Sequence, residues 1–151
     1  MTNILPSRRD YRFAEMAAIE AKRSGCLMQH GCVAVKNGRI FGRGYNNYRT
    51  RCKEGFIQNC ITCHAEMSAI REVNKLNINF KKISLYIVRV DHNNCLKSSA
   101  PCVDCMKHII RLKIKRIIYS NNNGELTVQN PVLYEIKHVT TGRRILTNKS
   151  K

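Results

Sequence analysis

The sequence has no tryptophan and only 3 prolines, 8 glycines and 10 acidic residues among its 151 positions. So little glycine and proline excludes collagen-like and low-complexity chains. No apolar run approaches the roughly 20 residues that a membrane-spanning helix needs, and the first residues lack the apolar stretch of a secretory signal peptide. We therefore expect a protein without a membrane span, located in the cytoplasm or the nucleus, where cysteines stay reduced.

Basic residues far outnumber the scarce acidic ones. Lys and Arg total 27, which gives a formal net charge of +17. This charge favours negatively charged partners such as nucleotides or nucleic acid, although a lysine-rich solvated surface produces the same excess. Hydrophobic residues make up 43% of the chain, which is enough for one packed core. We expect a single domain over residues 1–151, with residues 141–151 as a flexible basic tail.

The order of apolar and turn residues predicts alternating helices and strands. The expected helices cover 8–24, 63–76 and 101–113, and the expected strands cover 31–36, 39–45, 82–90 and 116–120. Residues 125–129 are expected as a hairpin partner or an edge strand. This order predicts an α/β fold, a three-layer α/β/α sandwich with a mixed central sheet.

Two local patterns refine this prediction. Asn37-Gly38 lies between the first two strands and is a strong hairpin signal. The nearly continuous apolar content of 82–90 is typical of a central strand. On the second helix, helical spacing predicts a buried edge formed by Met67, Ile70, Val73 and Leu76.

Two predicted helix starts carry residues that suit metal chemistry. The first start is His64-Ala65-Glu66, and the second contains Pro101, Cys102 and Cys105. One imidazole and two thiolates make a three-ligand zinc set that leaves a fourth position for water. Glu66 lies two residues beyond the histidine and is suited to carry protons to and from that water. H-x-E followed by P-C-x-x-C is the signature of zinc deaminases.

Eight cysteines are many for a chain of this size. Cys60 and Cys63 have the same two-residue gap as the pair above, and they are candidates for a second, structural zinc. The candidates to complete that site are Cys52, Cys26, Cys32 and His92. The ordinary alternative is that these cysteines are buried free thiols.

The segments CHAEMSAI, APCVDCMKHI and HGCVAVKNGRIFGRGYN resemble the cytidine/deoxycytidylate deaminase superfamily, especially its CMP/dCMP-type branch. The resemblance covers about residues 8–120. It implies a cytidine deaminase-like fold, one catalytic zinc, hydrolytic removal of an exocyclic amine, and a homo-oligomeric assembly.

The resemblance also implies roles for individual residues. His64, Cys102 and Cys105 would bind zinc, and Glu66 would shuttle protons. The remaining implied contacts are with substrate: the N–H of Ala65 with the base carbonyl, the C=O of Ala100 with the leaving amine, and Asn46 with the sugar.

The substrate is left open by the sequence. A cytosine nucleotide, dCMP or CMP, is favoured, with Arg49 and Arg51 of a basic loop as candidates to bind its phosphate. Tyr48 beside Arg49 would instead suit base stacking in a nucleic-acid cytidine or adenosine deaminase. A third alternative is a zinc-binding interaction domain without catalysis, against which the presence of Glu66 counts.

Overall fold

The computed structural model describes residues 4–47 and 64–133 of the chain. Within these ranges it contains three α-helices, a six-stranded sheet and two short 3₁₀ segments. The helices are α1 (Arg8–Ala21), α2 (Ala65–Lys75) and α3 (Val103–Arg111), and the 3₁₀ segments cover Phe80–Lys82 and Pro131–Leu133. The strands are β1 (Gln29–Lys36), β2 (Arg39–Tyr45), β3 (Ser84–Val90), β4 (Leu96–Lys97), β5 (Arg116–Ser120) and β6 (Leu126–Gln129). The predicted helices and strands are confirmed.

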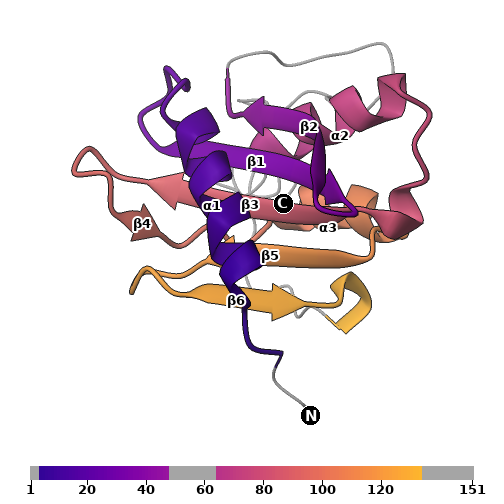
Figure 1. The fold of residues 1–151 in the computed structure, drawn as a ribbon. Helices are drawn as coiled ribbons and strands as arrows, with labels where there is room; N and C mark the ends of the chain where they lie inside the picture. The colour runs from indigo at the N-terminus through magenta and orange to yellow at the C-terminus, as the bar shows by residue number, and fades with distance from the viewer. Residues whose placement is uncertain (1–3, 48–63, 134–151) are drawn as a thin grey trace, which may run out of the picture.

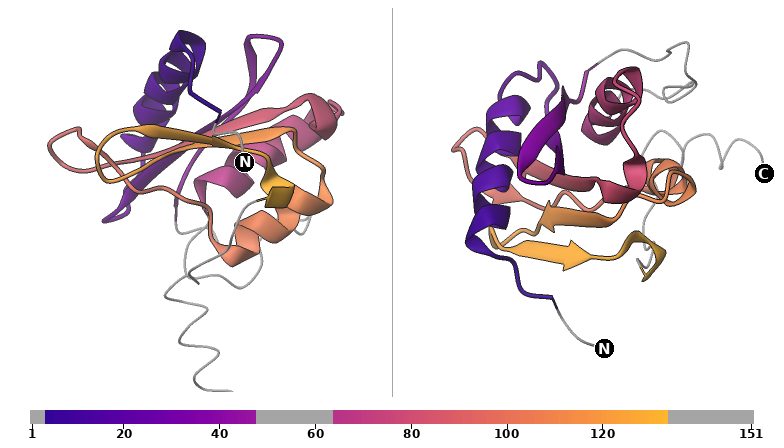
Figure 2. Two further views of the ribbon diagram at one scale, coloured as in Figure 1. Left: turned by 90° about the horizontal axis from the view of Figure 1, so that it is seen from below. Right: turned by 45° about the vertical axis from the view of Figure 1, so that its right-hand side comes forward.

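The sheet is mixed, as predicted, with the order β2-β1-β3-β5-β6 and β4 paired to β3 (Figure 1). β3 and β5 are parallel, whereas β1 pairs antiparallel with both β2 and β3. The parallel pair needs a crossover, and α3 provides it. α1 covers one face of the sheet, and α2 and α3 cover the other (Figure 2). The three-layer α/β/α sandwich is thereby confirmed.

The β1–β2 hairpin turns at the predicted dipeptide. Asn37 and Gly38 have φ values of 51° and 76°, the left-handed region that a two-residue hairpin turn of type I′ requires. The turn sets Lys36 opposite Arg39, and a shift of register between Ala34 and Val35 then brings Cys32 opposite Gly44. The register decides which side chains of β1 face α2, where the expected metal ligands begin.

Each face of the sheet has its own hydrophobic core. On the α1 face, Phe13 and Ala17 pack against Val33, Tyr86 and Val88. On the α2 and α3 face, the core includes the two cysteines expected to bind metal, and its members are Cys32, Ala34, Ala65, Met67, Ala69, Ile70, Val73, Ile83, Leu85, Ile87, Cys102, Cys105, Met106, Ile109, Ile114 and Ile117. The candidate site therefore lies at the edge of a packed core.

The structure corrects one predicted core position. Leu76 follows the last residue of α2 as its C-cap, and 57% of its surface is exposed. The helix ends one residue too early for Leu76 to stay on the buried edge, whereas Met67, Ile70 and Val73 are buried as expected. β4 was not predicted, because it has only two residues, which pair with Arg89 and Val90 at the end of the preceding strand.

α2 lies unusually close to β2, because two glycines remove the side chains between them. A Cβ at Gly42 would lie 2.4 Å from the carbonyl oxygen of Ala69, and one at Gly44 would lie 2.5 Å from that of Ala65. Contacts this short exclude any side chain. The first turn of α2 is therefore positioned directly against β2.

No helix within the described ranges is long and apolar enough to cross a bilayer. The predicted basic tail at 141–151 lies outside the described residues, and the single domain over 1–151 stays a prediction.

Candidate metal centre and active site

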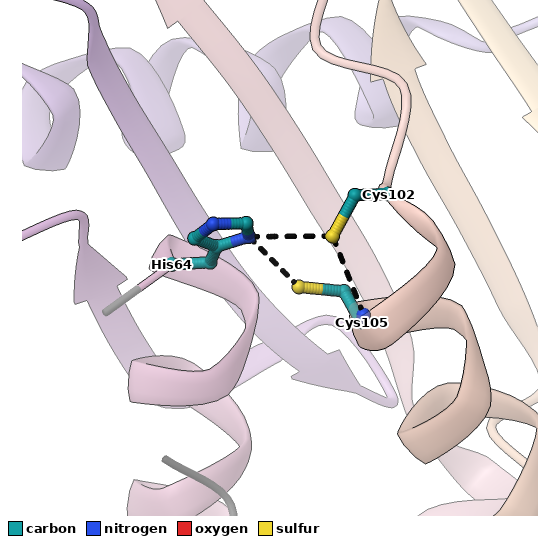
Figure 3. Close-up of side chains that lie close together, drawn as sticks. All are labelled: His64, Cys102 and Cys105. Carbon is teal, nitrogen blue, oxygen red and sulfur yellow. Dashed lines mark hydrogen bonds between the residues drawn. The ribbon is translucent and has the colours of Figure 1, made fainter. Parts of the chain in front are cut away.

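The starts of α2 and α3 bring the three expected metal ligands together. His64 is the N-cap of α2, and Cys102 is the N-cap of α3. The Nδ1 atom of His64 lies 3.2 Å from the Sγ of Cys105 and 3.5 Å from the Sγ of Cys102 (Figure 3). All three ligand atoms lie within 4.8 Å of one another. Segments nearly 40 positions apart in the chain therefore converge on one point.

These distances fit a tetrahedral zinc site. Zn–S bonds of about 2.3 Å and Zn–N bonds of about 2.0 Å separate nitrogen and sulfur ligands by roughly 3.5 Å. Among residues 4–47 and 64–133, His64, Cys102 and Cys105 form the only cluster of metal-binding side chains, and it has three members. Three protein ligands and a fourth position for water are characteristic of catalytic rather than structural zinc.

The charges within the cluster also suit a metal. A hydrogen bond from Cys105 and the nearby His64 lower the pKa of Cys102 to about 4, although burial opposes this. Burial alone would lower the pKa of His64, but its hydrogen bond to Cys102 and the negative charge of Glu66 raise it to about 9. The lowered pKa of Cys102 favours its thiolate, the form of cysteine that binds metal, at the dipole of a helix start. The hydrogen bond with Cys102 and burial raise the pKa of Cys105.

Glu66 lies in the first turn of α2, beside the three ligands. It is buried, and its Oε1 atom has no hydrogen-bond partner. Burial raises the pKa of this carboxyl, while the positive charge of His64 opposes the rise. A buried carboxyl oxygen without a partner is costly unless a ligand or water completes its hydrogen bonding. A carboxyl with a raised pKa beside a metal site can both accept and release a proton.

Asn46, expected to contact a sugar, is engaged with the start of β1. Its Oδ1 accepts from the N–H of His30 at 2.9 Å, and its Nδ2 donates to the carbonyl of Met28 at 2.6 Å. Its own N–H donates to the carbonyl of His30 at 3.2 Å. Asn46 therefore holds the chain that enters β1, and its contact with a sugar stays a prediction.

The two alanines expected to contact substrate lie at the same helix starts. Ala65 is the first residue of α2, and the side chain of His64 makes no capping hydrogen bond there. The first N–H groups of a helix have no partner within the helix, so the N–H of Ala65 is suited to bind an oxygen of a substrate. Ala100 lies directly before Pro101, which favours an extended backbone. Their substrate contacts stay predictions.

Ser99 anchors the segment that carries Ala100. Its hydroxyl donates to the carbonyl of Ile87 at 2.7 Å and accepts from the N–H of Ser120 at 2.9 Å. Its N–H donates to the carbonyl of Ser120, also at 2.9 Å. The segment entering α3 is thereby fixed to the middle of β3 and the end of β5.

Sequence reasoning missed His30, Cys32 and Ser99 as residues of the site. Cys32 lies close enough to Glu66 for that carboxylate to raise the thiol pKa further, beyond the effect of burial. Alternation along β1 places His30 on the same face as Cys32, and this was the only signal in the sequence that could have found it.

The remaining candidates fall outside the described residues. These are Arg49, Arg51, Cys52, Cys60 and Cys63. The second, structural zinc and the phosphate contacts of the basic loop therefore stay predictions.

Comparison with known proteins agrees with this site. The sequence profile of the cytidine and deoxycytidylate deaminase zinc-binding region matches residues 7–121. A deoxycytidylate deaminase of Schizosaccharomyces pombe is 31% identical over 128 residues, which cover 73% of this chain and 36% of that protein. A tRNA-specific adenosine deaminase of Streptococcus pyogenes is 32% identical over 113 residues, covering 74% of this chain and 62% of that protein.

A solved structure with the same fold is the dCMP deaminase of cyanophage S-TIM5 in complex with dCMP and dUMP. Its TM-score is 0.60 at 23% identity, and the match covers 79% of this chain and 85% of that one. The chain spans little more than a third of two yeast relatives, 36% of the Schizosaccharomyces pombe protein and 38% of its Saccharomyces cerevisiae counterpart. With the profile matched across both helix starts and the sheet between them, the chain belongs to the cytidine and deoxycytidylate deaminase family.

Proposed function

We propose that the chain is a zinc-dependent hydrolytic deaminase that converts a cytosine nucleotide, dCMP or CMP, to the uracil nucleotide and ammonia. The observation that carries this proposal is the convergence of three metal ligands beside the buried Oε1 of Glu66, which has no partner. The deoxycytidylate deaminases among the relatives, at 26 to 31% identity, support the nucleotide substrate.

Each group at the site has a defined task in this reaction. His64, Cys102 and Cys105 would hold the zinc, which would supply a Lewis acid that makes water easier to deprotonate. Glu66 accepts one proton of the water and delivers it to the ring nitrogen. It then takes the second proton of the same water and gives it to the departing amine. The oxygen of water replaces the amine on C4 of the cytosine, and ammonia leaves.

Substrate is oriented by backbone groups at the two helix starts. The N–H of Ala65 binds the carbonyl oxygen of the base, and the C=O of Ala100 accepts a hydrogen bond from the amine that leaves. Both groups belong to backbone that packing holds in place, so little reorganisation is needed as charge develops. Asn46 contacts the sugar, and Arg49 and Arg51 bind the phosphate of the nucleotide.

The substrate is tested by a product scan with the zinc-loaded protein. Cytidine, CMP, dCMP, dCTP, adenosine, guanine, tRNA and short single strands are incubated separately and analysed by mass spectrometry. We expect deamination of dCMP or CMP with no polymer present. Tight zinc binding with no product across the whole panel would instead identify a zinc-binding interaction domain.

Glu66→Gln separates catalysis from metal binding. The amide keeps the size of the side chain but cannot carry protons, so we expect unchanged zinc content and a rate at least about 100-fold lower. Zinc is measured by elemental analysis and turnover by ammonia release. A Glu66→Gln variant with nearly wild-type turnover would remove Glu66 from the mechanism.

A second candidate function is deamination of a base within RNA or single-stranded DNA. The relationship to a tRNA-specific adenosine deaminase and the net charge of +17 favour it. Polynucleotide binding releases several counterions and weakens steeply with salt, whereas a mononucleotide substrate loses much less. A product found only with tRNA or single strands, at a rate that falls steeply with salt, would establish this candidate.

The homo-oligomer implied by the family resemblance belongs to the same proposal. Ile110 on α3 is 41% exposed and is available for contact with a second copy. Light scattering coupled to gel filtration measures the assembly directly.

A further inference from the structure

Two buried polar side-chain atoms within the described ranges have no hydrogen-bond partner: Oε1 of Glu66 and Nε2 of His30. Buried polar atoms are almost always paired, so each such atom calls for an explanation. The first belongs to the proposed proton carrier. The second belongs to a histidine that the proposed mechanism does not use.

His30 lies at the same site as Glu66. Along β1 its side chain points to the same face as that of Cys32, which packs in the core together with Cys102 and Cys105. Cys32 pairs with Gly44, and Gly44 is the point where β2 meets the first turn of α2. His30 therefore lies two residues along β1 from Cys32, the residue opposite the point where β2 meets the start of α2.

Three further contacts fix His30 beside the expected substrate groups. Its N–H and its carbonyl are both hydrogen-bonded to Asn46, at 2.9 Å and 3.2 Å. It is close enough to His64 for the two side chains to interact electrostatically, and Arg89 lies opposite it on β3. His30 thus lies between the residue expected to hold the sugar and the start of the helix that holds the metal.

The imidazole of His30 suits an uncharged group of a ligand. Burial is the main cause that lowers the pKa of His30 to about 4, which favours the uncharged ring near neutral pH. A neutral imidazole has one nitrogen that donates and one that accepts. Nε2 therefore suits a hydroxyl or a ring atom of a nucleoside better than a phosphate, which favours a cation.

We propose that His30 is a substrate-binding residue of the deaminase site, whose Nε2 completes its hydrogen bonding with a polar group of the bound nucleoside. This inference rests on the proposed function and adds a side-chain contact from β1 to the contacts from the helix starts. It gives a partner to the buried Nε2 atom of this half-buried imidazole, which has none within the described residues.

The test compares His30→Leu with His30→Gln in the zinc-loaded protein. Leucine fills the space but removes the hydrogen bond, so kcat/KM for the wild-type substrate should fall at least about ten-fold. Glutamine can still reach a partner and should recover part of the loss. Zinc content should remain at the wild-type value in both variants, and thermal stability of His30→Leu should equal or exceed that of the wild type.

A second readout does not depend on turnover. In protein labelled with ¹⁵N-histidine, the signal missing from His30→Leu identifies the His30 ring, and its Nε2 shift should change on adding uridine monophosphates. Nucleotides with and without the 2′- and 3′-hydroxyls then locate the partner. If His30→Leu and the wild type have equal kcat/KM for a nucleotide that lacks one hydroxyl, that hydroxyl is the partner of His30. If kcat/KM falls equally for all the nucleotides, the partner is on the base.

The outcomes separate this inference from the proposed function. If the wild-type protein deaminates nothing in the product scan, the proposed function fails. If the wild type is active and His30→Leu has the same kcat/KM and no ligand-dependent shift exists, the inference alone fails. Loss of zinc from His30→Leu would also overturn it, since His30 would then support the metal ligands rather than the substrate.

Discussion

Gly44 lies where β2 passes against the first turn of α2. A Cβ at this position would lie 2.5 Å from the oxygen of Ala65 and 2.6 Å from the nitrogen of Ala69. Both are backbone atoms, so no change of rotamer relieves the contact. Because His64 and Glu66 begin this helix, a displacement of α2 is a displacement of the site.

We therefore expect Gly44→Ala to lower the free energy of unfolding by about 1–3 kcal/mol and to weaken zinc binding, since overpacking forces the backbone to shift. Urea denaturation and competition with a zinc chelator measure the two effects. Gly25→Ala is the matched control, because nothing lies within 4 Å of a Cβ there. Equal behaviour of the two variants would show that the approach of α2 to β2 is not constrained by Gly44.

For individual residues, the sequence predicts which side chains carry the chemistry better than it predicts where side chains lie in the fold. His64, Glu66, Cys102 and Cys105 were identified because metal ligands and a proton carrier need particular side chains at particular spacings. His30 and Ser99 were not identified from the sequence, because their roles depend on which strands lie beside each other. Pairing such as that of β1 with β3 joins residues far apart in the chain, and no local pattern specifies it.

Among the elements, the segment leading into α3 depends on distant strands for its conformation. Ser99 is buried and joins this segment to Ile87 in the middle of β3 and to Ser120 at the end of β5. Ala100, whose carbonyl is proposed to bind the leaving amine, follows directly. The position of this carbonyl is thus set by the sheet.

Ser99→Ala should leave the N–H of Ser120 and the carbonyl of Ile87 without their side-chain partner. We expect a loss of about 1–3 kcal/mol in stability and a fall of about ten-fold in kcat, because small displacements of orienting groups are costly in catalysis. Thermal unfolding and steady-state kinetics measure both. Ser98→Ala changes an exposed neighbour and serves as control. Unchanged kcat in Ser99→Ala would mean that Ala100 does not need this anchor.

The helices and long strands were predictable because their apolar periodicity is local. The ends of these helices and strands were less predictable. The second helix ends at Lys75, where Leu76 becomes an exposed cap, because the ends of a helix depend on capping and on neighbouring elements. The two residues of β4 form a strand only because β3 lies beside them, so their own sequence gave no signal.

Across the whole molecule, Asp10 links the helix on one face to the strands at the centre. Its carboxylate accepts from the hydroxyl of Tyr86 at 2.7 Å and from Arg116 at 3.3 Å, and it also accepts from the N–H of Ser7 at 2.9 Å. Burial alone would raise the pKa of Asp10, but these hydrogen bonds and the charge of Arg116 hold it below the ordinary value.

A depressed pKa stabilises the fold where the carboxyl is ionised. This stabilisation is complete above the ordinary pKa of an aspartate, about 4, and is lost as the pH falls through the lower pKa of the folded protein. Asp10→Asn should therefore cost about 1–3 kcal/mol at pH 7, and the difference from wild type should shrink below about pH 4.

Urea denaturation at several pH values measures this difference. Glu15→Gln, which removes an exposed negative charge from the same helix, is the control for net charge. A difference between Asp10→Asn and wild type that stays constant down to pH 3 would show that ionisation of Asp10 does not contribute to stability.

X-ray absorption at the zinc edge of the zinc-loaded protein tests the whole account most directly. We expect one zinc per chain with two sulfur neighbours at about 2.3 Å and two nitrogen or oxygen neighbours at about 2.0 Å, which correspond to two cysteines, one histidine and one water. The same spectrum should lose one sulfur neighbour in Cys102→Ala. Four protein ligands with three or more sulfurs, or no bound zinc, would contradict the proposed active site.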